Sequence, residues 1–364
     1  MRFIAMTLIA RQPDPVTGEP TPTAQRFREV VDHARLAEEL GFDGFGVGER
    51  HERPFLSSAP AVWLSHLAAL TTEIRLFTTV ATLALVDPVR AFEDYATLDH
   101  LSDGRLELMI GKGNGSAQRD LFAVTEDDQW ARNAESFEVF SRLWADNRIS
   151  ADTRFRPALR DVEVWPEPLQ RPLRIWHGSA TSTASVELAV AHGDPIFSAN
   201  VTHRVEPYAA LVRHYREQWA AAGRDPAHAA VGAGTAGLLV APRSQDAVAA
   251  FAPAFAHYLA AHRQSGVVPA FATLDEFVTD SSALIGSPQQ VIDKLHRYHE
   301  QLGHSVVHVP AEPGAVDPAA HRESMALFAS DVVPRLGDLP DPPWGWGSPD
   351  AQLSATHPKE VALS

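Results

Sequence analysis

The chain has 364 residues, 45% hydrophobic and 21% charged, so it is long and apolar enough to fold as a large globular protein rather than remain disordered. Its net charge of −15 would repel nucleic-acid phosphates and anionic lipid, so neither is an expected partner. The lack of cysteine excludes disulfides, thiolate nucleophiles and sulfur-ligated metals. No apolar run is long enough for a membrane span or a signal peptide, and we expect a cytoplasmic protein.

Short runs of β-branched and aromatic residues alternate with longer amphipathic stretches, which is the pattern of βα units around a parallel sheet. Eight strands are predicted, at 2–9, 43–48, 74–80, 105–110, 173–177, 195–199, 231–240 and 305–309. Helices are predicted near 23–40, 57–71, 88–101, 132–146, 182–192, 204–222, 244–261, 287–301 and 317–333. This pattern favours an α/β fold of the (β/α)8 TIM barrel type with inserted loops, although a doubly wound open sheet would alternate in the same way.

Local signals mark the ends of two helices. Thr23 is predicted to cap the first helix, and Gly41 supplies the residue after its end. Ser287 is predicted as an N-cap, with Pro288 in the first turn and Gln290 as the capping-box partner.

Three segments depart from the βα pattern. The stretches 111–131 and 147–170 lie between the fourth and fifth strands, where long connections serve as lids, binding loops or dimer contacts. We expect residues 1–336 to form a single barrel domain, followed by a proline-rich tail over 337–364. Trp344 and Trp346 are expected to dock, and the last residues to be mobile.

Ionisable residues follow the second strand, at the end of the barrel where working residues gather. They form the run Glu49-Arg50-His51-Glu52-Arg53. One interpretation is a polar pocket wall with His51 as a proton donor or acceptor. The other is a solvated cluster of salt bridges.

Small residues follow the third and fourth strands. Thr79 and Val80 belong to a hydroxyl-bearing run that would let a flat ligand lie against the backbone, although strand propensity alone also selects such residues. The glycine-rich loop around Lys112 and Asn114 would let a ligand approach the backbone, with Lys112 offering a charge for an anion. A simple flexible loop is the alternative, and no dinucleotide fingerprint occurs there.

A cluster of hydroxyl groups follows the fifth strand and precedes an apolar helix. The unpaired N–H groups of a helix N-terminus, together with several hydroxyls, are suited to bind a phosphate. Ordinary capping needs one Ser or Thr, although turns rich in these residues also occur without ligands. The candidate residues of this junction are Gly178, Ser179, Thr181, Ser182 and Ser185.

Other chemistries have little support. His296 and His299 are three residues apart on a predicted helix, but no third ligand is near, and no metal is expected. Ser182 lacks the G-x-S-x-G context of a hydrolase nucleophile.

Three spaced segments, 37–51, 87–105 and 286–291, together resemble the bacterial-luciferase-like flavin-dependent monooxygenases. The resemblance extends from residue 2 to about residue 336, and is strongest to the FMN-using branch. It implies a barrel, commonly dimeric, that uses reduced FMN and oxygen.

The resemblance also implies roles for the strand-end residues. Lys112 stands where luciferase has an arginine on the flavin phosphate, and Thr181, Ser182 and Ser185 stand on the remaining phosphate ligands. Thr79-Val80 falls on a non-prolyl cis peptide bond that packs beside the isoalloxazine ring. The family's Glu-His-His reads Glu49-Arg50-His51 here, so an arginine that cannot lend a proton at pH 7 replaces the catalytic histidine. His51 and Arg50 are therefore the catalytic candidates, the first as the titrating group and the second as a fixed positive charge.

The function expected from this resemblance is an FMN-dependent monooxygenase that oxidises a small organic substrate with oxygen through a C4a-peroxyflavin. A separate flavin reductase and a homodimer are expected with it. The alternatives are hydride transfer with the deazaflavin F420 and a non-catalytic flavin-binding protein.

Overall fold

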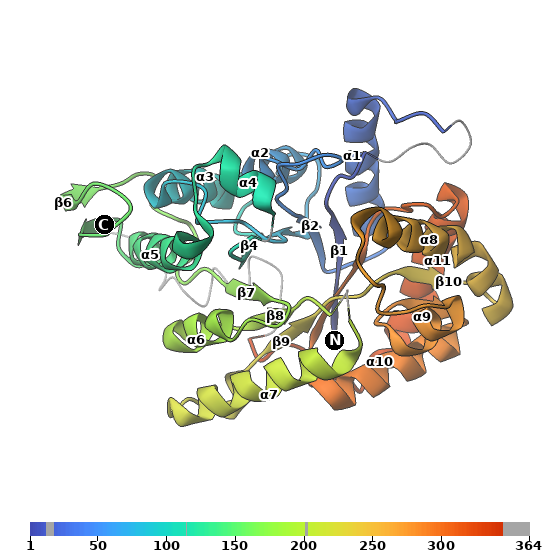
Figure 1. Cartoon of the computed structure of the whole chain (residues 1–364). Helices are drawn as coiled ribbons and strands as arrows, with labels where there is room; N and C mark the ends of the chain where they lie inside the picture. Colours follow the sequence, from blue (N-terminus) through green and yellow to red (C-terminus); the bar gives the residue numbers. More distant parts are fainter. Residues whose placement is uncertain (12–17, 114, 201–202, 345–364) are drawn as a thin grey trace, which may run out of the picture.

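Eight parallel strands close into a barrel surrounded by helices in the computed structural model, which describes residues 1–11, 18–113, 115–200 and 203–344 (Figure 1). The strands follow one another around the barrel as β1 (Arg2–Thr7), β12 (Val306–Pro310), β9 (Val231–Ala233), β8 (Ile196–Ser198), β7 (Ile175–Ser179), β4 (Leu106–Ile110), β3 (Arg75–Thr78) and β2 (Gly44–Val47). Each overlaps a predicted strand. The predicted TIM barrel is thus confirmed, and the open sheet is excluded by the pairing of β1 with both β2 and β12.

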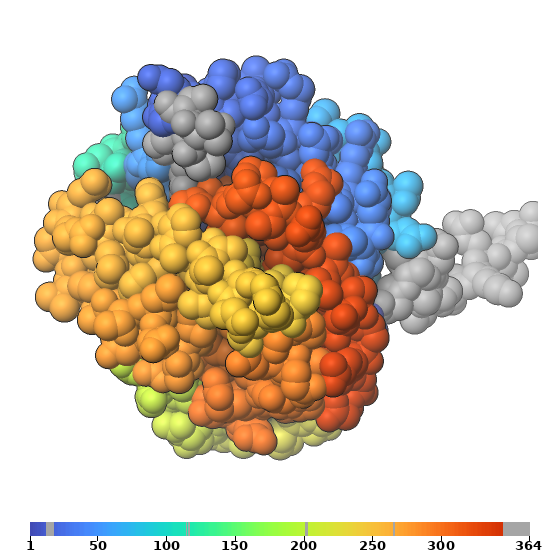
Figure 2. All heavy atoms as spheres, turned by 90° about the vertical axis from the view of Figure 1, so that its right-hand side faces the viewer, coloured from blue at the N-terminus to red at the C-terminus, as the bar shows by residue number. Residues whose placement is uncertain are grey.

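All nine predicted helices are present, and two short ones, α4 and α9, were not predicted. The helices are α1 (Thr23–Glu39), α2 (Pro60–Ala68), α3 (Pro88–Leu101), α4 (Ser116–Leu121), α5 (Glu126–Ala145), α6 (Thr183–His192), α7 (Val205–Ala221), α8 (Ser244–Ser265), α9 (Leu274–Asp280), α10 (Pro288–Leu302) and α11 (Pro318–Leu327). A turn of π-helix (Phe328–Val332) and two 3-10 turns (Pro226–His228 and Val333–Leu336) complete the helical segments. Figure 2 shows a blue segment from near the N-terminus beside a red segment from the last described part of the chain. Arg26 of α1 pairs with Glu312.

The predicted strand 231–240 is wrong in its second half. The barrel strand β9 ends at Ala233, and β10 (Leu238–Val240) instead pairs with β11 (Leu284–Gly286) in a separate two-stranded sheet. Gly234, directly after β9, lets the backbone approach Ala199, because a Cβ there would lie 1.9 Å from the Ala199 carbonyl oxygen. The segment 147–170, for which no regular structure was predicted, contains the antiparallel hairpin β5 (Arg148–Ala151) and β6 (Leu159–Glu163).

The predicted helix ends are partly correct. Thr23 is the first helical residue rather than the cap, because the carbonyl of Pro22 already accepts the N–H of Gln25 at 2.9 Å. Gly41 follows the helix with a φ of +77°, as predicted. Ser287 and Gln290 form the predicted capping box of α10.

The barrel interior is packed with large apolar side chains rather than open. Its central layer contains Ile4, Phe77, Met109, Trp176, Phe197 and Val306. Toward the N-terminal ends of the strands, the carboxylate of Glu107 accepts hydrogen bonds from Arg174 at 2.8 Å and from the Trp176 indole at 2.9 Å. Chemistry inside the barrel is therefore restricted to the C-terminal end of the strands, which we call the mouth.

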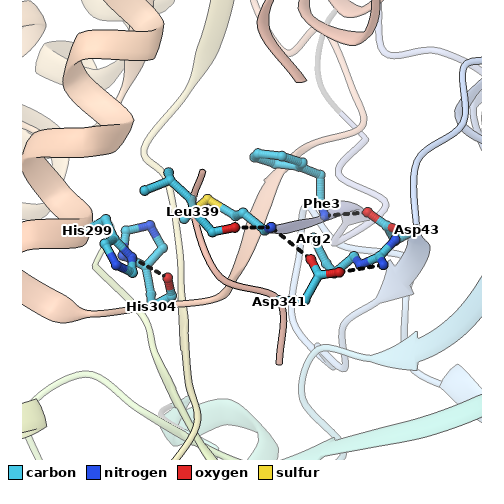
Figure 3. Close-up of polar contacts among 8 residues, drawn as sticks. Arg2, Phe3, Asp43, His299, His304, Leu339 and Asp341 are labelled. Atoms are coloured by element: carbon cyan, nitrogen blue, oxygen red, sulfur yellow. Dashed lines mark hydrogen bonds and ion pairs between the residues drawn. The ribbon is translucent and has the colours of Figure 1, made fainter. Parts of the chain in front are cut away.

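The chain after α11 closes the N-terminal end of the barrel. The Trp344 ring lies 5.5 Å from that of Trp176 and 4.3 Å from the Arg174 guanidinium carbon. The amino group of Met1 contacts Asp341 at 2.8 Å, and Asp341 also pairs with Arg2 (Figure 3). The expected docking of Trp344 is confirmed, whereas Trp346 lies outside the described residues.

Candidate functional site

The segment Thr79–Val80 lies across the mouth and rests on glycines of neighbouring strands. A Cβ on Gly111 or Gly178 would lie 3.0 or 2.7 Å from the Val80 side chain, and one on Gly48 would lie 2.7 Å from the Thr79 carbonyl oxygen. Only glycine permits so close an approach. The peptide bond between Thr79 and Val80 is cis, as the resemblance implied.

The hydroxyl-rich junction connects β7 to the N-terminus of α6. Ser179 Oγ accepts the Ser182 N–H at 3.0 Å and contacts the Ser182 carbonyl at 3.1 Å, which fixes the turn. Ser182 is the N-cap residue, but its hydroxyl makes no capping bond to the described backbone. Ser185 is buried and Thr181 is exposed. This junction therefore presents open helix N–H groups and an uncommitted hydroxyl, which suit a phosphate.

Lys112 lies in the loop after β4, the strand paired with β7 on one side of the barrel. The side-chain amide of Gln129 donates to the Lys112 and Gly113 carbonyls at 2.5 and 3.2 Å, so α5 holds this loop. The Lys112 amino group lies 5.6 Å from the centre of the Trp130 ring. The structure therefore places Lys112 beside the strand that carries the hydroxyl junction, while Asn114 lies outside the described residues.

His51 is held by a carboxylate that also organises the neighbouring strand end. Its Nε2 lies 2.9 Å from Glu49 Oε1, and Glu49 Oε2 accepts the Thr82 N–H at 2.8 Å. The side chains of His51 and Glu49 are only 9% and 8% exposed. Glu49 thus ties His51 to the segment that follows β3.

His51 and Glu49 form one wall of a pocket of about 260 Å³ beside the mouth. Phe122 packs edge-on against His51 with the ring centres 4.8 Å apart. Burial, assisted by the negative charge of Glu49, holds the pKa of Tyr95 well above its ordinary value, so this phenol is a neutral donor. The remaining lining residues are Ser58, Ala59, Pro60, Ala61, Val62, Ala81, Thr82, Leu83, Val86, Ala91 and Asp94, which are mostly apolar.

Arg50 has different partners from His51. Its guanidinium pairs with Glu52 and lies 4.7 Å from the centre of the Phe55 ring. The two catalytic candidates are therefore adjacent in sequence but engaged with separate groups.

The two helical histidines also have separate partners. His296 faces Asp338 at 3.7 Å, and His299 Nδ1 contacts the His304 carbonyl at 2.8 Å. Within the described ranges no three His, Asp or Glu side chains come together as a metal site would require.

No helix in the described part of the chain has the length and apolar character needed to cross a membrane.

Four residues near the mouth were not among the sequence candidates. Glu49 was only one charge in a run, Tyr95 lies on a helix whose spacing does not show where it points, and Phe122 directly follows α4, which was not predicted. His308 is a polar residue at an inward position of β12, between valines, and that alternation was a usable signal.

A family model described as "Luciferase-like monooxygenase" matches residues 1–305. The 4-hydroxyprotoasukamycin monooxygenase of Streptomyces nodosus subsp. asukaensis is 25% identical over 342 residues, or 88% of this chain and 91% of that one. The F420-dependent glucose-6-phosphate dehydrogenase of Beutenbergia cavernae is 31% identical over 183 residues, which cover 47% and 53% of the two chains.

The crystal structure of monooxygenase RslO1 from Streptomyces bottropensis superposes with a TM-score of 0.81 at 25% identity, covering 93% of this chain and 100% of that one. Alignments with two Sinorhizobium fredii proteins, y4wF and y4vJ, span only 44% and 51% of those relatives' lengths. The sequence resemblance expected to about residue 336 is thus matched by the family model as far as residue 305.

Proposed function

Since the chain belongs to the luciferase-like monooxygenase family, we propose that it is an FMN-dependent monooxygenase that uses reduced FMN and oxygen to oxidise a small organic substrate. The observation that carries the choice of FMN is the hydroxyl-rich start of α6 beside the Lys112 loop, which suits one terminal phosphate. The extensive similarity to a named monooxygenase supports the choice of oxygen chemistry.

The phosphate would be held by the N-terminus of α6 and by the hydroxyls around it. Ser182 has a hydroxyl without a capping role, Thr181 and Ser185 flank it, and Ser179 shapes the turn. Lys112 would add a positive charge to the same site. Charge-assisted hydrogen bonds of this kind contribute about 1.5–3 kcal/mol each.

The ring would lie at the mouth beside Thr79–Val80, near Gly178 and the loop that carries Asn114. Thr79 Oγ1 is buried without a hydrogen-bond partner in the described structure, so a polar group of a ligand would satisfy it. When bound there, reduced FMN would supply the electrons for the reaction with oxygen. The protein orients the reactants and excludes water.

His51 would move a proton to or from the substrate, with Glu49 fixing its ring orientation. Its pocket is mostly apolar, which favours an uncharged organic substrate. Arg50 would stabilise the anionic reduced flavin, in competition with its pairing to Glu52.

A second candidate is F420-dependent hydride transfer, which the similarity to an F420-dependent dehydrogenase supports. A non-catalytic flavin-binding protein is the third, because Arg50 replaces a histidine that is catalytic in luciferase. A separate reductase, a homodimer and a cytoplasmic location accompany the first proposal.

Oxygen labelling distinguishes these functions. The protein is supplied with ¹⁸O₂, FMN and a flavin reductase, and is tested against a panel of cyclic ketones and aldehydes. The proposal expects a product heavier by one ¹⁸O atom. Product formed only with reduced F420 and without oxygen would contradict it, as would FMN binding with no turnover of any panel member.

A further inference from the structure

His308 lies on β12 with its side chain turned into the barrel, just below the mouth. It stands two residues beyond the interior residue Val306, and its ring stacks on Phe197 with the centres 5.7 Å and the planes 14° apart. A Cβ on Gly234 would lie 2.6 Å from His308 Nε2, so glycine at that position makes room for the imidazole. The side chain is therefore fixed by contacts with β8 and with the residue that follows β9.

The imidazole is buried and lacks a partner for one of its nitrogens. His308 is 9% exposed, and its Nδ1 has no hydrogen bond within the described structure. Burial lowers the pKa of His308 to about 4, so the ring is neutral near pH 7 and offers one donor and one acceptor. A buried polar atom without a partner is costly, and such atoms at functional sites are commonly satisfied by a ligand.

The barrel order places His308 opposite the proposed phosphate site. Three strands separate β12 from β4 in either direction around the barrel, and β7 is next to β4. An eight-stranded barrel is only about as wide as the side chains that fill it. A ligand anchored by its phosphate at the ends of β4 and β7 would thus extend across the mouth toward β12.

We propose that His308 is a cofactor-binding residue that hydrogen-bonds the polar edge of the ring cofactor. That edge consists of the carbonyl and N–H groups that flavin and deazaflavin rings share, so the inference holds for FMN and for F420. It rests on the proposed binding of such a ring at the mouth. A neutral imidazole suits these uncharged groups, because it needs no counter-ion in the barrel.

A matched pair of variants tests the contact. His308→Phe keeps the stacking on Phe197 but removes both ring nitrogens. His304→Phe changes another buried histidine whose Nδ1 lacks a partner, but this one lies before β12 at the opposite end of the barrel. We expect His308→Phe to weaken FMN binding about 5- to 30-fold, and His304→Phe less than about 2-fold. Equal effects of the two variants would overturn the proposal.

A second test uses the unaltered protein, so its result does not depend on whether a variant folds. Histidine ¹⁵N resonances are recorded while FMN or F420 is added in separate titrations. The His308 nitrogens should shift with whichever cofactor binds, while those of His304 stay in place. Binding without any His308 shift overturns this inference alone, whereas failure of both cofactors to bind overturns the proposed function.

Discussion

Glu49 presents one carboxylate oxygen to His51 Nε2 at 2.9 Å and the other to the Thr82 N–H at 2.8 Å. The same carboxylate therefore orients the imidazole and fixes the segment after β3. A glutamine at this position can still accept the Thr82 hydrogen bond but has no charge to stabilise a protonated His51.

We expect His51→Ala to lower kcat about 100-fold or more, because a positioned proton donor contributes about 10²–10⁴ in rate. Glu49→Gln should lower kcat by a smaller factor with little change in KM, because it disturbs orientation rather than binding. Unchanged kcat in both variants would show that the pair is structural.

Neutralising Arg50 and neutralising Glu52 should shift the reduction potential of bound flavin in opposite directions. Arg50→Gln removes a positive charge near the anionic reduced form and should lower the potential. Glu52→Gln releases Arg50 from its ion pair and should raise it. A shift of about 30 mV corresponds to roughly 1.4 kcal/mol for a two-electron couple. If neither variant changes the potential, Arg50 has only a structural role in the loop 50–55, through its contacts with Glu52 and Phe55.

Trp344 is expected to stabilise the fold without taking part in catalysis. Its ring covers Trp176 and Arg174 at the closed end of the barrel. Trp344→Ala should lower the free energy of unfolding by about 2–4 kcal/mol and leave FMN affinity unchanged. Trp165 is 60% exposed, so Trp165→Ala is the matched control and should change stability by less than about 1 kcal/mol. Urea unfolding of the two variants checks this difference.

Acid should destabilise the protein well above the pH at which carboxylates titrate. Burial lowers the pKa of His304 to about 3 and that of His321 to about 4. The unfolded chain takes up protons on these groups below about pH 6.5 and the folded chain does not, so their stabilisation is complete above that pH and is lost as pH falls toward 4.

One such histidine loses about 2 kcal/mol of stabilisation between pH 7 and pH 5. His304→Gln should reduce the fall in unfolding free energy between these pH values by that amount. Urea titrations at pH 7 and pH 5 measure it. An equal fall in the variant and the unaltered protein would mean that His304 becomes protonated without unfolding.

The sequence was sufficient for the elements that depend on local pattern. The eight barrel strands and the Ser287 capping box follow from periodicity and from residues near one another in the chain. The end of β9 at Ala233 was missed, because the small and apolar residues that follow it continue the pattern of a strand as far as Val240. Thr23 was misassigned as a cap because the sequence does not show that the Pro22 carbonyl already begins the helix.

The candidate site also combines features that depend on local sequence with features that depend on distant contacts. Ser182 and its neighbours could be named as candidates because their chemistry is concentrated in one short junction. The pairing of Arg50 with Glu52 and of His51 with Glu49 was not determined, because all four charges are consecutive and only the backbone path decides which ones meet. His308 was missed because the contacts that fix its side chain come from Phe197 and Gly234, which are far from it in sequence.

If one phosphate binds between the start of α6 and Lys112, FMN and riboflavin should respond differently to changes at that site. Dissociation constants of both are measured by fluorescence for the unaltered protein and for Lys112→Ala combined with Ser182→Ala. We expect FMN binding to weaken by about 2–4 kcal/mol, while binding of riboflavin, which has no phosphate, is unaffected. Equal weakening of both ligands, or no change for FMN, would contradict it.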